Sequence, residues 1–450
     1  MAVLTSGFAT ALSGGNELEK ILSLAKRAGA EAEVFFTSYE KLPAIFEANR
    51  LKQLKANQGT LVALRIIKGG RVGFAITTRL DNRQELVNRA VEVSQFGASA
   101  RFELPLRQFY PQIEVYDSEI NGVTVGQMVE LGESLIARLR AHSPELVCDV
   151  EVAKETALVQ ISNTRGGEAS YHKSVIDIAI EGILTRGTDM LFVGDEASSC
   201  HPIRDVDELA CSVINQLELA EKEASVATGY LPVIFTPHGV ASAFIPSLAL
   251  GFNGRIVLEG ASPLGNRLAE QVFDPRLSLR DDATIIYQPR SRPCDDEGIP
   301  SQRTSLIENG VVKSFLYDLQ TAGLANTQST GNGDRSGGLP APRVSALVIE
   351  PGDIAFEDMV KDLREGLVVE QLMGAEQTNI LGGEFGGNVL LGYKVEKGEI
   401  VGRVKDTMVS GNVYKVLSEL AAIGKETRWI GGMISTPAIF CPKLEVTSKS

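Results

Sequence analysis

The chain has 450 residues, of which 44% are hydrophobic and 22% charged, and its formal net charge is −13. This length is too great for one ordinary core and favours two or three domains. The composition is typical of a soluble globular protein and excludes a largely disordered or membrane-embedded one. The excess of carboxylates disfavours direct nucleic-acid binding, because that affinity comes mostly from Lys and Arg side chains that displace condensed counterions.

Cysteine usage and the lack of long apolar runs indicate the compartment. The five cysteines lie far apart in the sequence and form no C-x-x-C pair, which is typical of a reduced, intracellular protein. Residues 1–15 have neither the basic nor the apolar region of a secretory signal. No run reaches the roughly 18 apolar residues that a membrane-spanning helix requires. We therefore expect a cytoplasmic protein without a membrane partner.

Helix signals are clear in the first part of the chain. Asn16 can cap a helix in which Glu19 completes a capping box, and Gly29 follows the end of this helix. Apolar periodicity predicts a second helix from Asp81 to Gly97 and a third that begins near Thr124.

Strand signals separate and follow these helices. The segments 61–67 and 71–78 are β-rich and flank Gly69-Gly70, whose tolerance of positive φ predicts a hairpin. After the third helix come four alternating or apolar runs, which predict an antiparallel sheet. These runs are 146–153, 157–162, 170–181 and 183–193. A further helix is expected to begin at Asp205.

A domain boundary is expected at the small and polar segment 224–229, where helical periodicity stops and a β-rich pattern begins. We place an amino-terminal α+β domain at residues 1–225 and a β-rich carboxy-terminal domain at residues 230–450. In the second domain the predicted strands include 345–349, 389–395 and 439–446, and the predicted helices are 358–366 and 413–423. The expected fold class is α+β, and the second domain should be largely antiparallel and barrel-like.

The sequence offers no catalytic metal site or nucleophile motif. A catalytic zinc needs three protein ligands, most often with two histidines on one helix. The four histidines are His142, His172, His201 and His238. They are too far apart for one helix or turn to present a pair. The glycine-rich segments 260–265 and 331–337 match a nucleophile elbow and a dinucleotide loop only in part, and we expect both to be turns.

Two polar segments could carry function. Asp295-Asp296-Glu297-Gly298 places three carboxylates in a row, which could bind a cation, a peptide amine or backbone amides. Ser329 to Arg335 is a polar loop with one fixed cation, which could hold a peptide carboxylate or carbonyl. Either segment could equally be a structural turn, and the residues by themselves leave both interpretations open.

Taken in order, several segments resemble the TldD/PmbA family, once described as modulators of DNA gyrase and associated with an intracellular zinc peptidase. The matching segments are 295–298, 310–325, 329–335, 382–387 and 398–446. The likeness extends in pattern across nearly the whole chain, and the ordered set is specific although each segment alone is weak. It implies an α+β amino-terminal domain followed by a β-rich carboxy-terminal domain.

The resemblance also bears on catalysis, because the family has two branches. In the TldD branch an H-E-x-x-x-H segment and a later cysteine hold zinc, whereas the TldE/PmbA branch lacks them and pairs with a TldD partner. In this sequence Pro246, Ser247 and Gly251 stand where His, Glu and His are expected, and Cys441 falls inside an expected strand. The resemblance therefore implies no catalytic residue, metal site or cofactor in this chain, with zinc in a TldD-type partner.

We therefore predict a TldE/PmbA-like subunit of a TldD/TldE-type zinc metalloprotease, one that lacks the metal site and helps to enclose and bind a peptide or unfolded protein. The candidate substrate-binding residues are Asp296, Glu297, Asn332 and Arg335. Two alternatives remain open. One is a stand-alone homodimer that binds peptides or proteins without cleaving them. The other is an enzyme of another class that uses the carboxylates of 295–297 as acid and base or as ligands for a hard cation.

Overall fold

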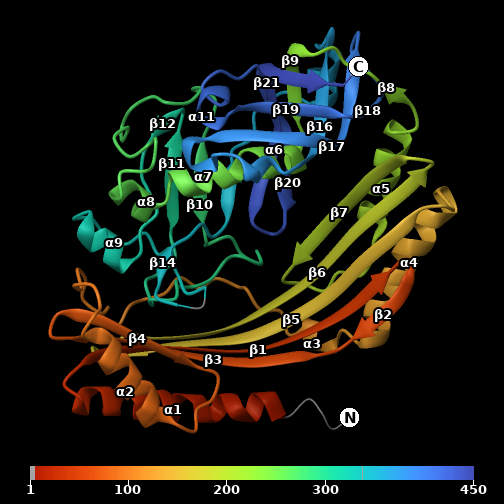
Figure 1. Ribbon diagram of the computed structural model, residues 1–450. Coiled ribbons are helices and arrows are strands. Elements are labelled where there is room, and N and C mark those ends of the chain that lie inside the picture. The colour runs from red at the N-terminus through yellow and green to blue at the C-terminus, as the bar shows by residue number, and fades with distance from the viewer. Residues whose placement is uncertain (1–5, 337, 450) are drawn as a thin grey trace.

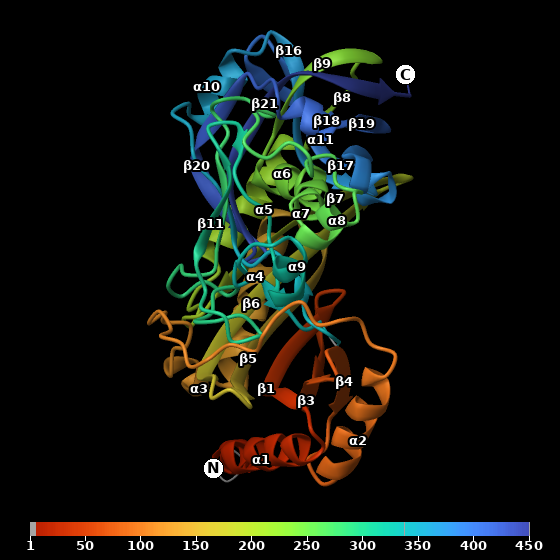
Figure 2. The same cartoon turned by 90° about the vertical axis from the view of Figure 1, so that its left-hand side faces the viewer.

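Two large β-sheets dominate the computed structural model, which describes residues 6–336 and 338–449 (Figure 1). The first sheet has seven strands and lies within residues 31–199, and the second has twelve strands and lies within residues 223–448. Helices pack against both sheets, so the predicted α+β fold class is confirmed (Figure 2).

The elements of the first sheet and its helices are α1 (Ser6–Arg27), β1 (Glu31–Glu47), β2 (Arg50–Leu54), β3 (Asn57–Lys68), β4 (Arg71–Thr77), α2 (Arg83–Ser94), α3 (Glu119–Gly122), α4 (Val125–His142), β5 (Val147–Asn163), β6 (Glu168–Arg186), β7 (Asp189–Ser199) and α5 (Asp207–Leu219). Those that follow are β8 (Glu223–Ala224), β9 (Gly229–Phe235), α6 (Pro237–Ala243), α7 (Ile245–Gly251), α8 (Gly254–Leu258), β10 (Leu279–Asp282), β11 (Arg303–Glu308), β12 (Val311–Val312), α9 (Leu319–Leu324), β13 (Gly333–Asp334), β14 (Ala341–Pro342), β15 (Leu347–Ile349), α10 (Phe356–Lys361), β16 (Glu365–Met373), η1 (Ala375–Gln377), η2 (Ile380–Gly382), β17 (Glu384–Glu396), β18 (Glu399–Val404), β19 (Thr407–Asn412), α11 (Val413–Val416), β20 (Ala422–Ile430) and β21 (Ile434–Ser448). Within the described residues, none of these helices has both the length and the apolar character needed to cross a membrane.

The first sheet is antiparallel, in the order β4-β3-β1-β5-β6-β7, with β2 paired to β1. Alternation along β1 places Val34 and Phe36 against α1 and α2, while Phe35 points to the other face. The helices α4 and α5 pack farther along the sheet, over β5, β6 and β7. The face that carries Phe35 is therefore open to contact from the second part of the chain.

In the second sheet, five strands close into a barrel. β21 pairs with β9 and β19, β9 pairs with β16, and β17 pairs with both β16 and β19. The helices α6 and α7 pack into the core of this part, where Phe244 lies edge-on to Phe235 and Phe385 with ring centroids 4.8 and 5.6 Å apart. Such aromatic pairs contribute about 0.5–1.5 kcal/mol each beyond burial. The predicted barrel-like character is confirmed.

Local signals predicted several elements of the first part correctly. Gly69 and Gly70 have φ values of 57° and 73° in the β3–β4 hairpin, and Thr124 caps α4. The predicted helix start at Asn16 is wrong, because α1 runs from Ser6 to Arg27 and contains Asn16. The alanine and leucine residues before Asn16 are good helix formers, which is consistent with a helix that continues through the capping signal.

Two further boundaries differ from the prediction. The runs 146–153 and 157–162 form the single strand β5, and the runs 170–181 and 183–193 are separated at Gly187, whose φ is 66°, and not at Gly182. Gly182 is inside β6, where an added Cβ would lie 2.9 Å from Val193. This glycine is therefore needed for close packing and not for a turn.

The predicted helices at 358–366 and 413–423 are too long. They correspond to α10, which ends at Lys361, and to α11, which ends at Val416. The residues that follow begin β16 and β20. Short apolar runs fit both helical and strand periodicity, so pairing within the sheet decides whether these residues form a helix or a strand.

A buried aspartate joins the first sheet to the second. The Asp195 side chain on β7 contacts His238 Nε2 on α6 at 3.1 Å and accepts a hydrogen bond from Arg428 Nη2 on β20 at 2.5 Å. Burial acts to raise the pKa of Asp195, but the hydrogen bonds from His238 and Ser212 and the charge of Arg428 outweigh it and lower that pKa. The ionised carboxylate therefore stabilises the contact between the sheets.

This lowered pKa predicts a pH-dependent contribution to stability. Because Asp195 has a lower pKa in the folded protein than its ordinary value of 3.8, its contribution is present above that value and lost as the pH falls through the folded one. At pH 7, D195N should reduce the free energy of unfolding by about 1.5–3 kcal/mol, and the difference from the parent should shrink toward pH 3. Thermal denaturation across this range measures it. D353N, at an exposed position, is the control, and a pH-independent difference for D195N would contradict the assignment.

Candidate functional site

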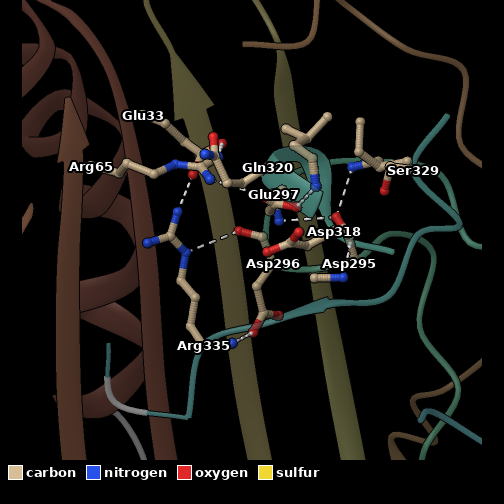
Figure 3. A network of polar contacts seen from close by, with 12 residues as sticks. Glu33, Arg65, Asp295, Asp296, Glu297, Asp318, Gln320, Ser329 and Arg335 are labelled. Carbon is tan, nitrogen blue, oxygen red and sulfur yellow. Dashed lines mark hydrogen bonds and ion pairs between the residues drawn. The ribbon is translucent and has the colours of Figure 1, made fainter. Parts of the chain in front are cut away.

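Two loop segments, 295–298 and 329–335, meet strands β1 and β3 of the first sheet (Figure 3). Glu33 on β1 and Arg65 on β3 are directly opposite in the antiparallel register. Their side chains therefore leave the same face of the sheet, the one that also carries Phe35. The first sheet thus presents one acid and one base to the incoming loops.

Four buried charges alternate in sign at this junction. Arg65 Nη2 lies 3.0 Å from Glu33 Oε2, Arg65 also forms an ion pair with Glu297, and Arg335 forms an ion pair with Glu33. No more than 2% of any of these side chains is exposed. Buried ions are tolerated when they are paired and hydrogen-bonded, and here two carboxylates balance two guanidinium groups.

The pKa shifts show how burial and charge oppose each other in this group. Burial raises the pKa of Glu33, although Arg65 and Arg335 act to lower it. Burial acts to lower the pKa of Arg65, but Glu33 and Glu297 outweigh it and raise that pKa. The ring centroid of Phe102 lies 4.5 Å from Arg65 Cζ, which adds a cation–π contact.

Asp295 organises the backbone of both loops. Its side chain accepts hydrogen bonds from the backbone amides of Glu297 and Ile299, both at 2.9 Å, and of Gly333 at 2.8 Å. Burial, together with the nearby charge of Glu297, raises the pKa of Asp295 to about 8. Its oxygens are occupied by backbone donors and are not presented to a ligand.

The next two carboxylates also contact protein groups. Asp296 accepts hydrogen bonds from the backbone amide of Arg335 at 2.7 Å and from Arg292 Nη1 at 3.0 Å. Glu297 Oε2 accepts one from the amide of Leu319 at 2.7 Å, at the start of α9. The acidic segment therefore ties together the second loop, α9 and the first sheet.

Asn332 belongs to a neighbouring polar group. Its side-chain amide donates to Asp281 Oδ2 at 2.7 Å and to the Arg343 carbonyl at 3.0 Å. Asp281 also accepts a hydrogen bond from the amide of Ser345 at 2.7 Å. Asn332 is buried, and its contacts fix the second loop to β10 and not to the first sheet.

The structure thus brings together Asp296, Glu297 and Arg335 and places Asn332 apart from them. Of the four, Asp296 has the most exposed ionisable side chain, at 13%. The arrangement differs from the expected open peptide-binding surface, because the charged groups already pair with one another across the two sheets. Substrate binding by these residues stays a prediction, and their observed contacts have an architectural role.

Glu33 and Arg65 were not among the site residues predicted from the sequence. Each is a single charge within a short apolar run, in A-E-V-F-F and L-R-I-I respectively. A charge at such a position is almost never buried unless it is paired. This pattern could have identified both residues as members of a buried ion pair, although it could not have identified their loop partners.

The residues of α7 do not fit a zinc ion. Pro246 and Gly251 offer no ligand side chain, and Ser247 is buried. An added Cβ at Gly251 would lie 2.5 Å from the Tyr414 hydroxyl, which donates a hydrogen bond to the Ser247 carbonyl at 3.2 Å. Packing thus occupies the space beside this helix. Within residues 6–336 and 338–449, no group of three or more His, Cys, Asp or Glu side chains is placed to hold a metal ion.

Comparison with known protein families shows to which family the chain belongs. Two family models match, one described as PmbA/TldA metallopeptidase domain 1 at residues 32–94 and one as the PmbA/TldA metallopeptidase C-terminal domain at residues 228–448. The chain belongs to the PmbA/TldD family. The first match contains Glu33 and Arg65, and the second contains both loops of the junction.

Individual relatives agree with this assignment over most of their length. An uncharacterised protein of Methanocaldococcus jannaschii is 25% identical over 94% of this chain and 98% of its own, and a metalloprotease of the same organism is 25% identical over 91% and 92%. The fold matches a solved structure of TldE from Thermococcus kodakarensis with a TM-score of 0.87, at 23% identity over 96% of this chain and 100% of that one. A Thermotoga maritima structure described as a modulator of a DNA gyrase has a TM-score of 0.88, 22% identity and the same coverage.

An Arg335 substitution tests the architectural role of the junction. Removing one partner of a buried ion pair costs about 3–5 kcal/mol, so R335Q should lower the free energy of unfolding in urea by about that amount. The double variant E33Q/R335Q removes one charge of each sign and should cost less than the sum of the two single changes. R343Q is the matched control, because Arg343 is in the same region and 55% exposed. Equal effects of R335Q and R343Q would refute the role.

A glycine substitution tests the packing beside α7. G251A places a methyl group 2.5 Å from the Tyr414 hydroxyl, so this variant should have a lower melting temperature than the parent. Adding Y414F removes the hydroxyl oxygen and should restore part of the loss. G122A is the control, since nothing lies within 4 Å of an added Cβ there. Equal melting temperatures for G251A and G122A would show that the space beside α7 accommodates the added methyl group.

Proposed function

We propose that this chain is a TldE/PmbA-type subunit that pairs with a zinc-bearing TldD-type partner, helps to enclose a peptide and cleaves nothing by itself. The observation that carries the proposal is the set of residues that helix α7 presents. This helix lies in a chain that matches the metallopeptidase family on both sides of the boundary region, yet it presents proline, serine and glycine where zinc ligands are expected. The match to a TldE structure along its whole length supports the same branch.

The proposed contribution to peptide binding rests on strand edges. Within the described residues, β7 pairs with no strand other than β6, and β20 pairs with β21 and is bridged on its other side only by Ile354 at Gly424. Each strand therefore leaves some backbone groups on one side without a strand partner. An extended peptide can add to such an edge through main-chain hydrogen bonds that place little demand on its sequence. We propose the cytoplasm as the site of action, in keeping with the scattered, unpaired cysteines.

The contacts disfavour one alternative. An enzyme that used residues 295–297 as acid and base would need at least one carboxylate directed at a substrate. Instead, these carboxylates accept hydrogen bonds from backbone amides and pair with Arg65 and Arg292. The homodimer alternative is separated from the preferred proposal by the experiment below.

The chain should be purified alone and after mixing with a zinc-bearing TldD-type relative from the same cell. We expect the isolated chain to bind no stoichiometric zinc and to leave an unfolded peptide intact. The mixture should form a heterodimer, detected by light scattering, and cleave faster than the relative alone. A relative whose motif glutamate is replaced by Gln is the control, because it should pair without cleaving. Stoichiometric zinc with peptide cleavage by the isolated chain would overturn the proposal. An inactive homodimer that does not bind the TldD-type relative would favour the stand-alone homodimer alternative.

A further inference from the structure

A surface pocket of about 330 Å³, lined by four charged side chains, lies between the two sheets. Its floor is formed by β5 and β6, and its walls by β7, the loop at 289–290 and the β20–β21 turn. The polar and turn residues that matter here are Glu155, Lys173, Asp177, Ser198, Arg290 and Gly431. Segments from both parts of the chain therefore enclose it.

The register of β5 and β6 sets the charges on the floor of this pocket. Lys173 is opposite Ala157, and Glu155 is opposite Val175, so Lys173 and Glu155 are diagonal neighbours on one face. Diagonal positions are about 7–8 Å apart, which leaves room between the two charges. Asp177 follows on the same face and accepts a hydrogen bond from Ser198.

The two floor charges attract each other across the diagonal, and Glu155 also has Lys41 directly opposite it in the β1–β5 register. Among the described residues, no carboxylate lies within 4 Å of the Lys173 ammonium, and no cation lies within 4 Å of the Glu155 carboxylate. Arg290, on the opposite wall, is exposed and likewise unpaired within the described chain. Lys173 and Glu155 are half-buried and form no close ion pair, which is costly, and a ligand that satisfies both would relieve that cost.

The titration behaviour of the two floor groups agrees with this shielding. Burial lowers the pKa of Lys173 to about 8, with Arg292 and Arg290 acting in the same direction and Cys200 and Glu155 against it. Burial also raises the pKa of Glu155, although Lys41 and Lys173 act to lower it. Each group is thus shifted toward its neutral form, as expected when burial outweighs nearby opposite charges.

We infer that this pocket binds a small zwitterion, a free amino acid or a dipeptide, with its carboxylate beside Lys173 and Arg290 and its ammonium group beside Glu155 and Asp177. The volume is near the lower limit for small-molecule sites and suits one or two residues better than a long peptide. Pockets of this kind occur preferentially between domains. The inference goes beyond the proposed function and does not depend on it, because it concerns this chain without a partner.

Binding of alanyl-alanine to the purified full chain tests the inference, by calorimetry and by the shift in melting temperature. We expect the free dipeptide to bind and to raise the melting temperature, since its two ends would link groups from both parts of the chain. N-acetyl-alanyl-alanine and alanyl-alanine amide each lack one charge and should bind at least tenfold more weakly. Acetate and inorganic phosphate, which carry no ammonium group, should also bind at least tenfold more weakly.

Variants assign the two ends of the ligand. K173Q should weaken alanyl-alanine binding at least tenfold. E155Q should do the same while leaving the affinity for N-acetyl-alanyl-alanine, which has no ammonium group, unchanged. K52Q, on the exposed strand β2, is the matched control and should bind like the parent. Because Arg290 is exposed, R290Q should fold normally and weaken binding even if K173Q does not fold.

Three outcomes would overturn the inference. These are no binding of alanyl-alanine at millimolar concentrations, equal binding of the free and capped dipeptides, and equal binding of acetate or phosphate, which would indicate a simple anion site. None of them bears on whether the chain pairs with a zinc-bearing subunit, so failure here and failure of the proposed function are distinguishable.

Discussion

The alternating charges of Glu33, Arg65, Glu297 and Arg335 are the interaction on which the relation between the two sheets depends. An unpaired charge at such depth would be far more costly than the pair is favourable, so each of the four side chains requires the others. The register of β1 and β3 supplies the first acid and base, and the loops at 295–298 and 329–335 supply their partners. Loop conformation in one part of the chain is therefore matched to strand register in another.

Local patterns were sufficient to predict much of the fold. Helix capping at Thr124, the glycine hairpin at Gly69-Gly70 and strand alternation depend on residues close in sequence, and these features were predicted correctly. The boundaries at Asn16, Gly182 and 413–423 were wrong because several local conformations were compatible with each segment. There, helix extension, close packing or sheet pairing decided between them.

The candidate site could be predicted only in part, for a physical reason. Both loops could be identified from the sequence as candidate segments, but the partners of Glu297 and Arg335 are 232 and 302 residues away in the sequence. A pattern read along the chain contains no information about such contacts. Burial changes the interpretation of the acidic segment as well, because its row of carboxylates is not free to bind a ligand but is occupied by amides and guanidinium groups.

The position of β21 has a consequence for biosynthesis. This strand pairs with β9, β15, β19 and β20, so it joins an early strand of the second sheet to late ones. As the ribosome extends the chain from its amino end, β9 emerges about two hundred residues before the strand that will lie beside it. Until then its edge is exposed and able to pair with another nascent chain, an aggregation hazard that a chaperone or rapid completion of synthesis would limit.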